Sequence, residues 1–144
     1  MSRSKIVQPS DLHKAETYAP TAGMKSAARR AIRWKEEGKA KGAGTAVGWT
    51  RAGQLARGEN LSLDTVKRMY SFFSRHEVDK QGKDFYNTSN PSNGRIMWDA
   101  WGGDAGFSWS RKIVERAKRI DKEIFSGFGQ DQTKSTSFNS VFKN

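Results

Sequence analysis

The residues best suited to metal or acid–base chemistry lie in one short segment, His76, Glu77 and Asp79. Imidazole and carboxylate groups could hold a metal ion or move a proton. A metal site normally needs three or four ligands in a fixed geometry, and the chain's other histidine is His13, far away near the N-terminus. We therefore interpret this segment as the charged end of a helix, where Arg75 and His76 complement the helix dipole.

Asp99 and Asp104 form a second possible site, a pair of carboxylates five residues apart. A simpler interpretation makes Asp104 the N-cap of the following helix and Asp99 a surface residue or the partner of an arginine. The sequence shows no recognisable pair of a nucleophilic side chain and the general base that would activate it. We therefore expect no enzymatic activity, no cofactor and no metal.

Two further features could bind nucleotides. The glycine-containing run KAKGAGTAVG, residues 39–48, matches neither phosphate-binding glycine motif, and we interpret it as a flexible connector. Exposed aromatic rings can stack on nucleobases, and four such side chains flank Gly102 and Gly103. Because so polar a chain needs its large rings for burial, core packing is favoured for these four, Trp98, Trp101, Phe107 and Trp109.

The composition indicates an anionic partner. The 144 residues include 26 Lys and Arg against 15 Asp and Glu, a formal net charge of +11. Phosphates of nucleic acid, an acidic membrane surface or an acidic protein would complement this charge. There is no cysteine, which excludes disulfides and thiolate metal sites. No apolar run is long enough for a membrane span and residues 1–20 lack the apolar core of a secretory signal, so we expect no membrane association.

Hydrophobic periodicity predicts an all-α fold of about five helices between two extended polar tails. The tails are residues 1–22 and 125–144, and the basic helical domain is 23–124. Within it we expect helices over 23–37, 49–57, 62–76, 94–101 and 104–124. Val66, Met69, Tyr70 and Phe73 recur at the spacing of one buried helix face.

Two of these helices carry basic faces that would meet phosphates. The first face comprises Lys25, Arg29 and Arg33. The second lies on the last predicted helix and comprises Arg111, Lys112, Arg116 and Arg119.

Residues 55–68, LARGENLSLDTVKR, resemble a helix-turn-helix DNA-binding segment, with the pair of helices over 49–76. The resemblance rests on Leu55, Ala56, Leu61, Thr65, Val66 and Ser62, which we expect to cap the second helix. It implies that Leu61 and Val66 pin the second helix onto the first, and that Asn60 takes the left-handed turn position where the family usually has glycine. It also implies a groove-facing set comprising Ser62, Leu63, Lys67 and Arg68, together with Asp64.

A broader stretch, about residues 23–112, resembles a small domain encoded by tailed bacteriophages in virion and head-morphogenesis contexts. The segments SAARRAIRWKEEG, LSLDTVKRMYSFFSRHEVDK and GRIMWDAWGGDAGFSWSRK carry this resemblance. It implies a DNA-associated virion component in the particle or the host cytoplasm, which would contact DNA phosphates through its basic helices and neighbouring phage structural proteins through its tails. The alternatives are a helix-turn-helix regulator and a protein that binds an acidic host factor.

Overall fold

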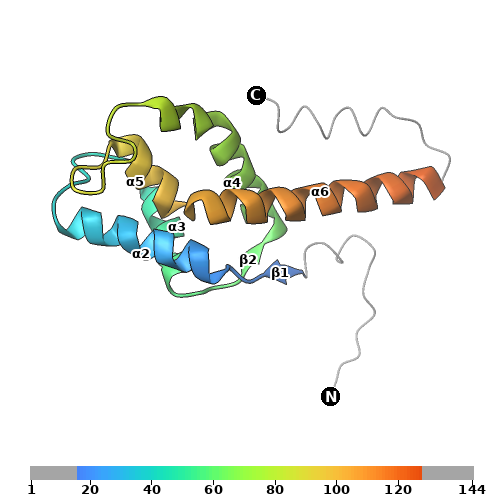
Figure 1. The fold of residues 1–144 in the computed structure, drawn as a ribbon. Helices are drawn as coiled ribbons and strands as arrows, with labels where there is room; N and C mark the ends of the chain where they lie inside the picture. Colours follow the sequence, from blue (N-terminus) through green and yellow to red (C-terminus); the bar gives the residue numbers. More distant parts are fainter. Residues whose placement is uncertain (1–15, 128–144) are drawn as a thin grey trace, which may run out of the picture.

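The computed structural model describes residues 16–127, with side chains up to residue 122, and it confirms the all-α class. Five α-helices, one 3-10 helix and a two-stranded ribbon make up this part of the chain (Figure 1). The ribbon joins β1, Thr17–Tyr18, to β2, Leu61–Ser62. The helices are α2 Ala22–Glu36, α3 Ala46–Ala56, α4 Leu63–His76, η1 Glu77–Gln81, α5 Asn93–Ala100 and α6 Gly103–Gly127.

Hydroxyl caps fix where four of the helices begin. Thr21, Thr45, Ser62 and Ser92 each accept a hydrogen bond from the backbone N–H three residues later, which satisfies a group that the helix leaves unpaired. The predicted cap at Ser62 is therefore confirmed. The predicted cap at Asp104 is wrong, because this residue lies inside the first turn of α6 and its carboxylate binds side chains elsewhere.

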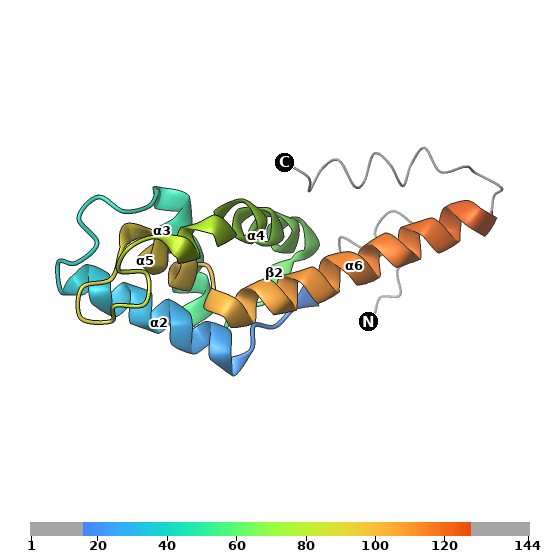
Figure 2. The same cartoon turned by 45° about the horizontal axis from the view of Figure 1, so that its top comes forward.

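The core forms around α2, which packs on α3, α5 and α6, while α4 packs chiefly on α6. Val66, Met69 and Phe73 are fully buried, as their spacing predicted, whereas Tyr70 is half-buried. The C-terminal half of α6 extends beyond the other helices in both ribbon views (Figures 1 and 2). Arg116 and Arg119 on that extension are exposed.

The predicted N-terminal tail, residues 1–22, ends earlier than expected, because residues from Thr17 onward belong to the folded body. β1 pairs antiparallel with β2, and the Trp109 indole donates a hydrogen bond of 3.1 Å to the carbonyl of Ala19. Pro20 is buried. The rest of this predicted tail, residues 1–15, and most of the predicted C-terminal tail, residues 128–144, lie outside the described residues.

The second helix of the helix-turn-helix-like segment begins at its predicted cap, but the first helix begins three residues earlier than expected, and the turn and packing differ. The left-handed residue is Gly58, with φ of 75°, rather than Asn60. Glycine adopts this conformation without the steric cost that Cβ imposes. α3 packs mainly on α2 and α4 mainly on α6, whereas the resemblance implied that α3 and α4 pack on each other.

The two expected loops contain more structure than the sequence indicated. In the glycine-containing run, Ala40 and Ala43 are buried, and the Trp49 indole donates to the Ala43 carbonyl at 3.1 Å. The end of the run forms the first turn of α3, which begins at Ala46, and the part before it is packed rather than a free connector. The second of these loops, between α4 and α5, begins with η1 and buries Phe85, which is 2% exposed.

Candidate nucleic-acid interface

The exposed face of α6 presents all four of its predicted cations to solvent. Gly106, Ser110, Val114 and Ala117 form the buried stripe of this helix. The opposite faces carry Arg111, Lys112, Arg116 and Arg119, all exposed. None of these four forms a hydrogen bond or ion pair within the described part of the chain.

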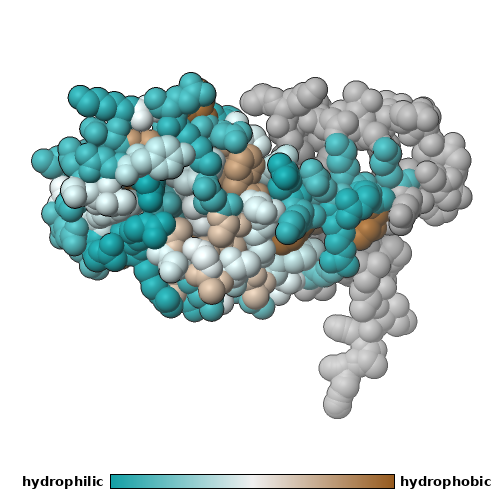
Figure 3. All heavy atoms as spheres, in the orientation of Figure 1, coloured by the Kyte–Doolittle hydropathy of each residue, from teal (hydrophilic) through white to brown (hydrophobic). Residues whose placement is uncertain are grey.

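Three of these cations define what we call the α6 basic stripe, Lys112, Arg116 and Arg119. They follow the i, i+4, i+7 spacing of one helix face and span about 10 Å along the axis. Glu115 is the exposed acid nearest to them in sequence, and it pairs with none of them. Hydrophilic residues dominate this projecting part of the molecule (Figure 3).

The predicted basic face of α2 is partly engaged within the protein. Arg29 donates to the carbonyl of Ala56 at 3.0 Å, and Arg33 lies 3.9 Å from Glu37. Lys25 is half-buried and lies against Gly58. Two of the three α2 cations thus contact the end of α3 and the turn after it, and the third lies near an acid. The α6 cations have no such contacts within the described residues, so α6 is the stronger candidate for an anion-binding surface.

The predicted groove-facing set on α4 is divided by the structure. Ser62 is exposed but its hydroxyl caps the helix, and Arg68 is exposed. Lys67 is half-buried. Leu63 is only 7% exposed, so its predicted place in the groove-facing set is wrong. Leu63 falls three residues before Val66, and this helical spacing already indicated the buried face.

Arg51 on α3 was missed by the sequence reasoning, although it belongs to the buried stripe of that helix. Gly48, Arg51, Ala52 and Leu55 recur at helical spacing and are all buried. Arg51 is 8% exposed, and its guanidinium lies over the Trp101 ring, 5.5 Å from the centroid. A charged residue in an apolar stripe was the signal available from the sequence.

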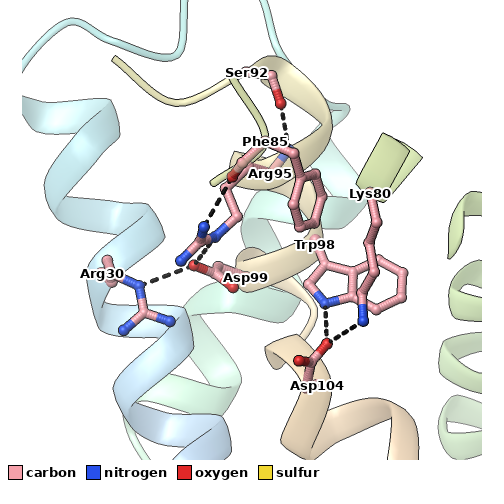
Figure 4. Close-up of polar contacts among 8 residues, drawn as sticks. All are labelled: Arg30, Lys80, Phe85, Ser92, Arg95, Trp98, Asp99 and Asp104. Atoms are coloured by element: carbon pink, nitrogen blue, oxygen red, sulfur yellow. Dashed lines mark hydrogen bonds and ion pairs between the residues drawn. The ribbon is translucent and has the colours of Figure 1, made fainter. Parts of the chain in front are cut away.

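A buried polar network joins α2 to α5 (Figure 4). One carboxylate oxygen of Asp99, Oδ2, accepts hydrogen bonds from Arg30 Nε at 2.9 Å and Arg95 Nε at 3.0 Å. Arg95 also donates to the Phe85 carbonyl at 2.8 Å. The Asp99 side chain is 3% exposed, so the arginine partnership is confirmed and the surface alternative is wrong. The network holds α2, α5 and the loop before α5 together.

Asp104 forms a separate, more exposed set of contacts beside this network (Figure 4). Oδ1 of its carboxylate accepts from the Trp98 indole at 2.9 Å and from Lys80 Nζ at 2.8 Å. Burial opposes ionisation of Asp104, but the hydrogen bonds from Lys80 and Trp98 outweigh it and lower the pKa of the carboxyl. Asp104 thus joins η1 to the start of α6.

Two concave regions adjoin these elements. A cavity of about 230 Å³ is lined by Arg30, Arg95, Asp99 and the glycines that begin α6. The two arginines that line this cavity bind Asp99, so the charged groups are occupied in holding the fold together. A groove of about 640 Å³ runs between β1 and α6, with Tyr18, Trp109 and Lys112 along it. The groove therefore brings two aromatic rings to the first cation of the α6 basic stripe.

The structure gives the His76 segment a local role. His76 Nδ1 lies 3.2 Å from the Asp79 carboxylate, and its ring packs against Phe72 at a centroid distance of 4.7 Å. Among the described residues, no group of three or more potential ligands could hold a metal ion.

The aromatic cluster is largely internal: Trp98 and Trp101 are buried, and Phe107 and Trp109 are half-buried.

None of the helices in residues 16–127 has the length and apolarity needed to cross a membrane. Comparison with known proteins found no matching family model, no matching curated protein and no matching solved structure.

Proposed function

We propose that this chain is a non-enzymatic, DNA-associated protein that contacts the phosphate backbone of duplex DNA through α6. The α6 basic stripe carries the proposal. Its three cations are exposed on a helix that projects from the body, and they lack acidic partners within the described residues. Free cations on a projecting helix can reach an anionic polymer without first breaking internal ion pairs.

The spacing of the stripe suits repeated phosphates. Its length of about 10 Å corresponds to roughly three base-pair steps along one DNA strand. Such contacts neutralise charge without reading base edges, so we expect binding that tolerates many sequences. Arg111, on the adjoining face, would add a further contact.

A place in the phage particle is the second part of the proposal. It is supported by the resemblance of residues 23–112 to a small domain of tailed bacteriophages, and by the charge of +11. The protein would act in the virion or the host cytoplasm, beside phage structural proteins. Mass spectrometry of purified particles tests this part. Its absence from particles that contain all other structural proteins would overturn the assignment.

Salt-dependent titration tests the DNA contact. Removing two phosphate contacts with Arg116→Gln/Arg119→Gln should lower the slope of log affinity against log salt by about two units. The matched control is Lys41→Gln/Lys83→Gln, which removes the same charge from two exposed residues, one in the loop before α3 and one in the loop before α5. Both loops lie away from the projecting half of α6 (Figure 1). Equal loss in both double variants would mean that total charge, rather than α6, determines binding. No wild-type affinity at low salt would reject the proposal.

A further inference from the structure

The groove between β1 and α6 has the size and lining of a small-ligand site. Its volume is about 640 Å³, within the range of about 300–1,000 Å³ that is typical of pockets for small organic molecules. β1 and the residues after it form one side, the first half of α6 forms the other, and the two elements lie side by side in both ribbon views (Figures 1 and 2). Among the described residues that line the groove, Lys112 is the one with a charge.

Two aromatic rings line this groove, Trp109 from α6 and Tyr18 from β1. Both are half-buried, because part of each ring packs against the core. Polar bonds hold the ring edges: the indole N–H donates to the Ala19 carbonyl at 3.1 Å, and the Tyr18 hydroxyl donates to the Glu16 carboxylate at 2.7 Å. Within residues 16–127, no other aromatic ring is stacked on either of them. The rings are therefore fixed in place and offer surface to a planar ligand.

Lys112 places a positive charge beside these rings. It is exposed and has no hydrogen bond or ion pair to any residue that the structure describes. Lys112 follows Trp109 by three residues, so the two side chains are neighbours on one helix face, with Cβ atoms about 5–6 Å apart. Arg116, also exposed, continues the positive charge one helical turn further along α6, about 6 Å away. The groove thus combines aromatic surface with cations at one end.

We propose that this groove binds one unpaired nucleotide of the DNA, with the base stacked on Trp109 and the phosphate at Lys112. Proteins that hold single strands combine a positive groove with aromatic side chains in this way, and any base can stack because every base has a π-face. An apolar peptide segment would fill the groove but leave Lys112 without a partner, whereas a nucleotide engages both the rings and the charge.

The inference rests on the proposed function and extends it, because the α6 basic stripe would continue from this nucleotide onto the neighbouring duplex. A base inside a duplex is paired and stacked on its neighbours, so it cannot enter the groove without first being extruded. We therefore expect the protein to prefer DNA ends or gaps that carry unpaired bases.

Two matched overhang duplexes test this preference. They share one double-stranded part and carry a single-stranded overhang of about three nucleotides, which is either thymidine or abasic. Both contain the same number of phosphates, so a difference in affinity reports the bases alone. The wild type should bind the thymidine overhang about fivefold more tightly or better. Stacking on Trp109 should also quench part of the tryptophan fluorescence with the thymidine overhang and not with the abasic one.

Substitutions in the groove should remove the preference for thymidine. Trp109→Leu removes the ring and should reduce the preference to less than about twofold, whereas Trp109→Phe keeps an aromatic face and should retain part of it. Both changes lose the bond to Ala19, so thermal melting must show that the variants are folded at the assay temperature. Ser108→Glu leaves that bond intact, because Ser108 is an exposed residue that lines the groove. Its carboxylate would pair with Lys112 one turn later and repel the phosphate, which should likewise reduce the preference to less than about twofold.

Ser74→Glu is the matched control for charge. It makes the same change at an exposed position on α4 that does not line the groove. The overall affinity of this variant for DNA should fall slightly, because the net charge is lower, but its preference for the thymidine overhang should equal that of the wild type.

The outcomes separate this inference from the proposed function. If the wild type binds blunt duplex but binds the two overhangs equally, the inference is wrong, the α6 contact stands, and the groove is left to an apolar peptide. A preference that survives in both Trp109→Leu and Ser108→Glu would also reject the groove as its source. If single-stranded oligothymidylate binds and quenches but blunt duplex does not bind, the duplex contact is rejected while the groove site stands. Binding to none of these DNAs would reject both.

Discussion

Replacing Asp99 with asparagine should test how strongly the buried network holds the fold. The substitution keeps the shape of the side chain but removes the charge that two arginines share through Oδ2. Asn can still accept one hydrogen bond through its amide oxygen. Arg30 and Arg95 would then lie close together without a counterion, at a position where the Asp99 side chain is only 3% exposed.

The expected cost is about 3 kcal/mol of unfolding free energy. Removing one partner of a buried ion pair typically costs about 3–5 kcal/mol, because an uncompensated charge remains. The lower end applies here, since the Arg30 side chain is 35% exposed and can regain water. Arg95 has less access to solvent, at 14%, but keeps its bond to the Phe85 carbonyl. For a chain of this size, the melting temperature should fall by about 6–12 °C.

Urea unfolding followed by circular dichroism measures this cost, and Asp104→Asn is the matched control. The Asp104 side chain is 75% exposed, and asparagine can still accept a hydrogen bond from the Trp98 indole. Asp104→Asn should therefore lower the free energy of unfolding by less than about 1 kcal/mol. Adding Arg95→Met to Asp99→Asn should recover part of the cost, because it removes one of the two stranded charges.

Equal costs for the Asp99 and Asp104 substitutions would refute this reasoning. So would a loss below about 1 kcal/mol for Asp99→Asn, because it would mean that water or another group already compensates the two arginines. A double variant less stable than the sum of its single changes would show that Arg95 contributes through packing on its aromatic neighbours.

Three further predictions concern the core, the N-terminal strand and pH. Val66→Ala removes methyl groups from a fully buried site and should cost about 1–2 kcal/mol in urea unfolding. Deleting residues 1–15 should leave the melting temperature nearly unchanged, whereas a deletion through Ala19 should lower it, because the ribbon and the Trp109 bond are lost. The lowered pKa of Asp104 means that its stabilising effect is present above its ordinary pKa and is lost as pH falls through the lower native value. Asp104→Asn should therefore flatten the decline in melting temperature below about pH 4.

The sequence alone determined the helical elements, because their signals are local. The spacing of Val66, Met69 and Phe73 defines one face of α4, and Ser62 caps it through a bond to a residue three positions away. The same local spacing placed Leu63 in the buried face, and there the resemblance to a helix-turn-helix segment misled the assignment. The net charge and the basic face of α6 also followed from residue types and period.

Only the tertiary structure decided which charges are buried and which remain free. Arg30 bonds Asp99 across 69 residues, and Trp109 bonds the Ala19 carbonyl across 90, so neither contact leaves a trace in local spacing. Within residues 16–127, Arg51 has no acidic partner, because the groups that meet its guanidinium are the Trp101 ring and the Gln54 amide. Periodicity predicts which side of a helix faces inward, but the identity of the facing groups depends on how distant segments meet, and those groups determine whether a buried charge has a partner of opposite sign.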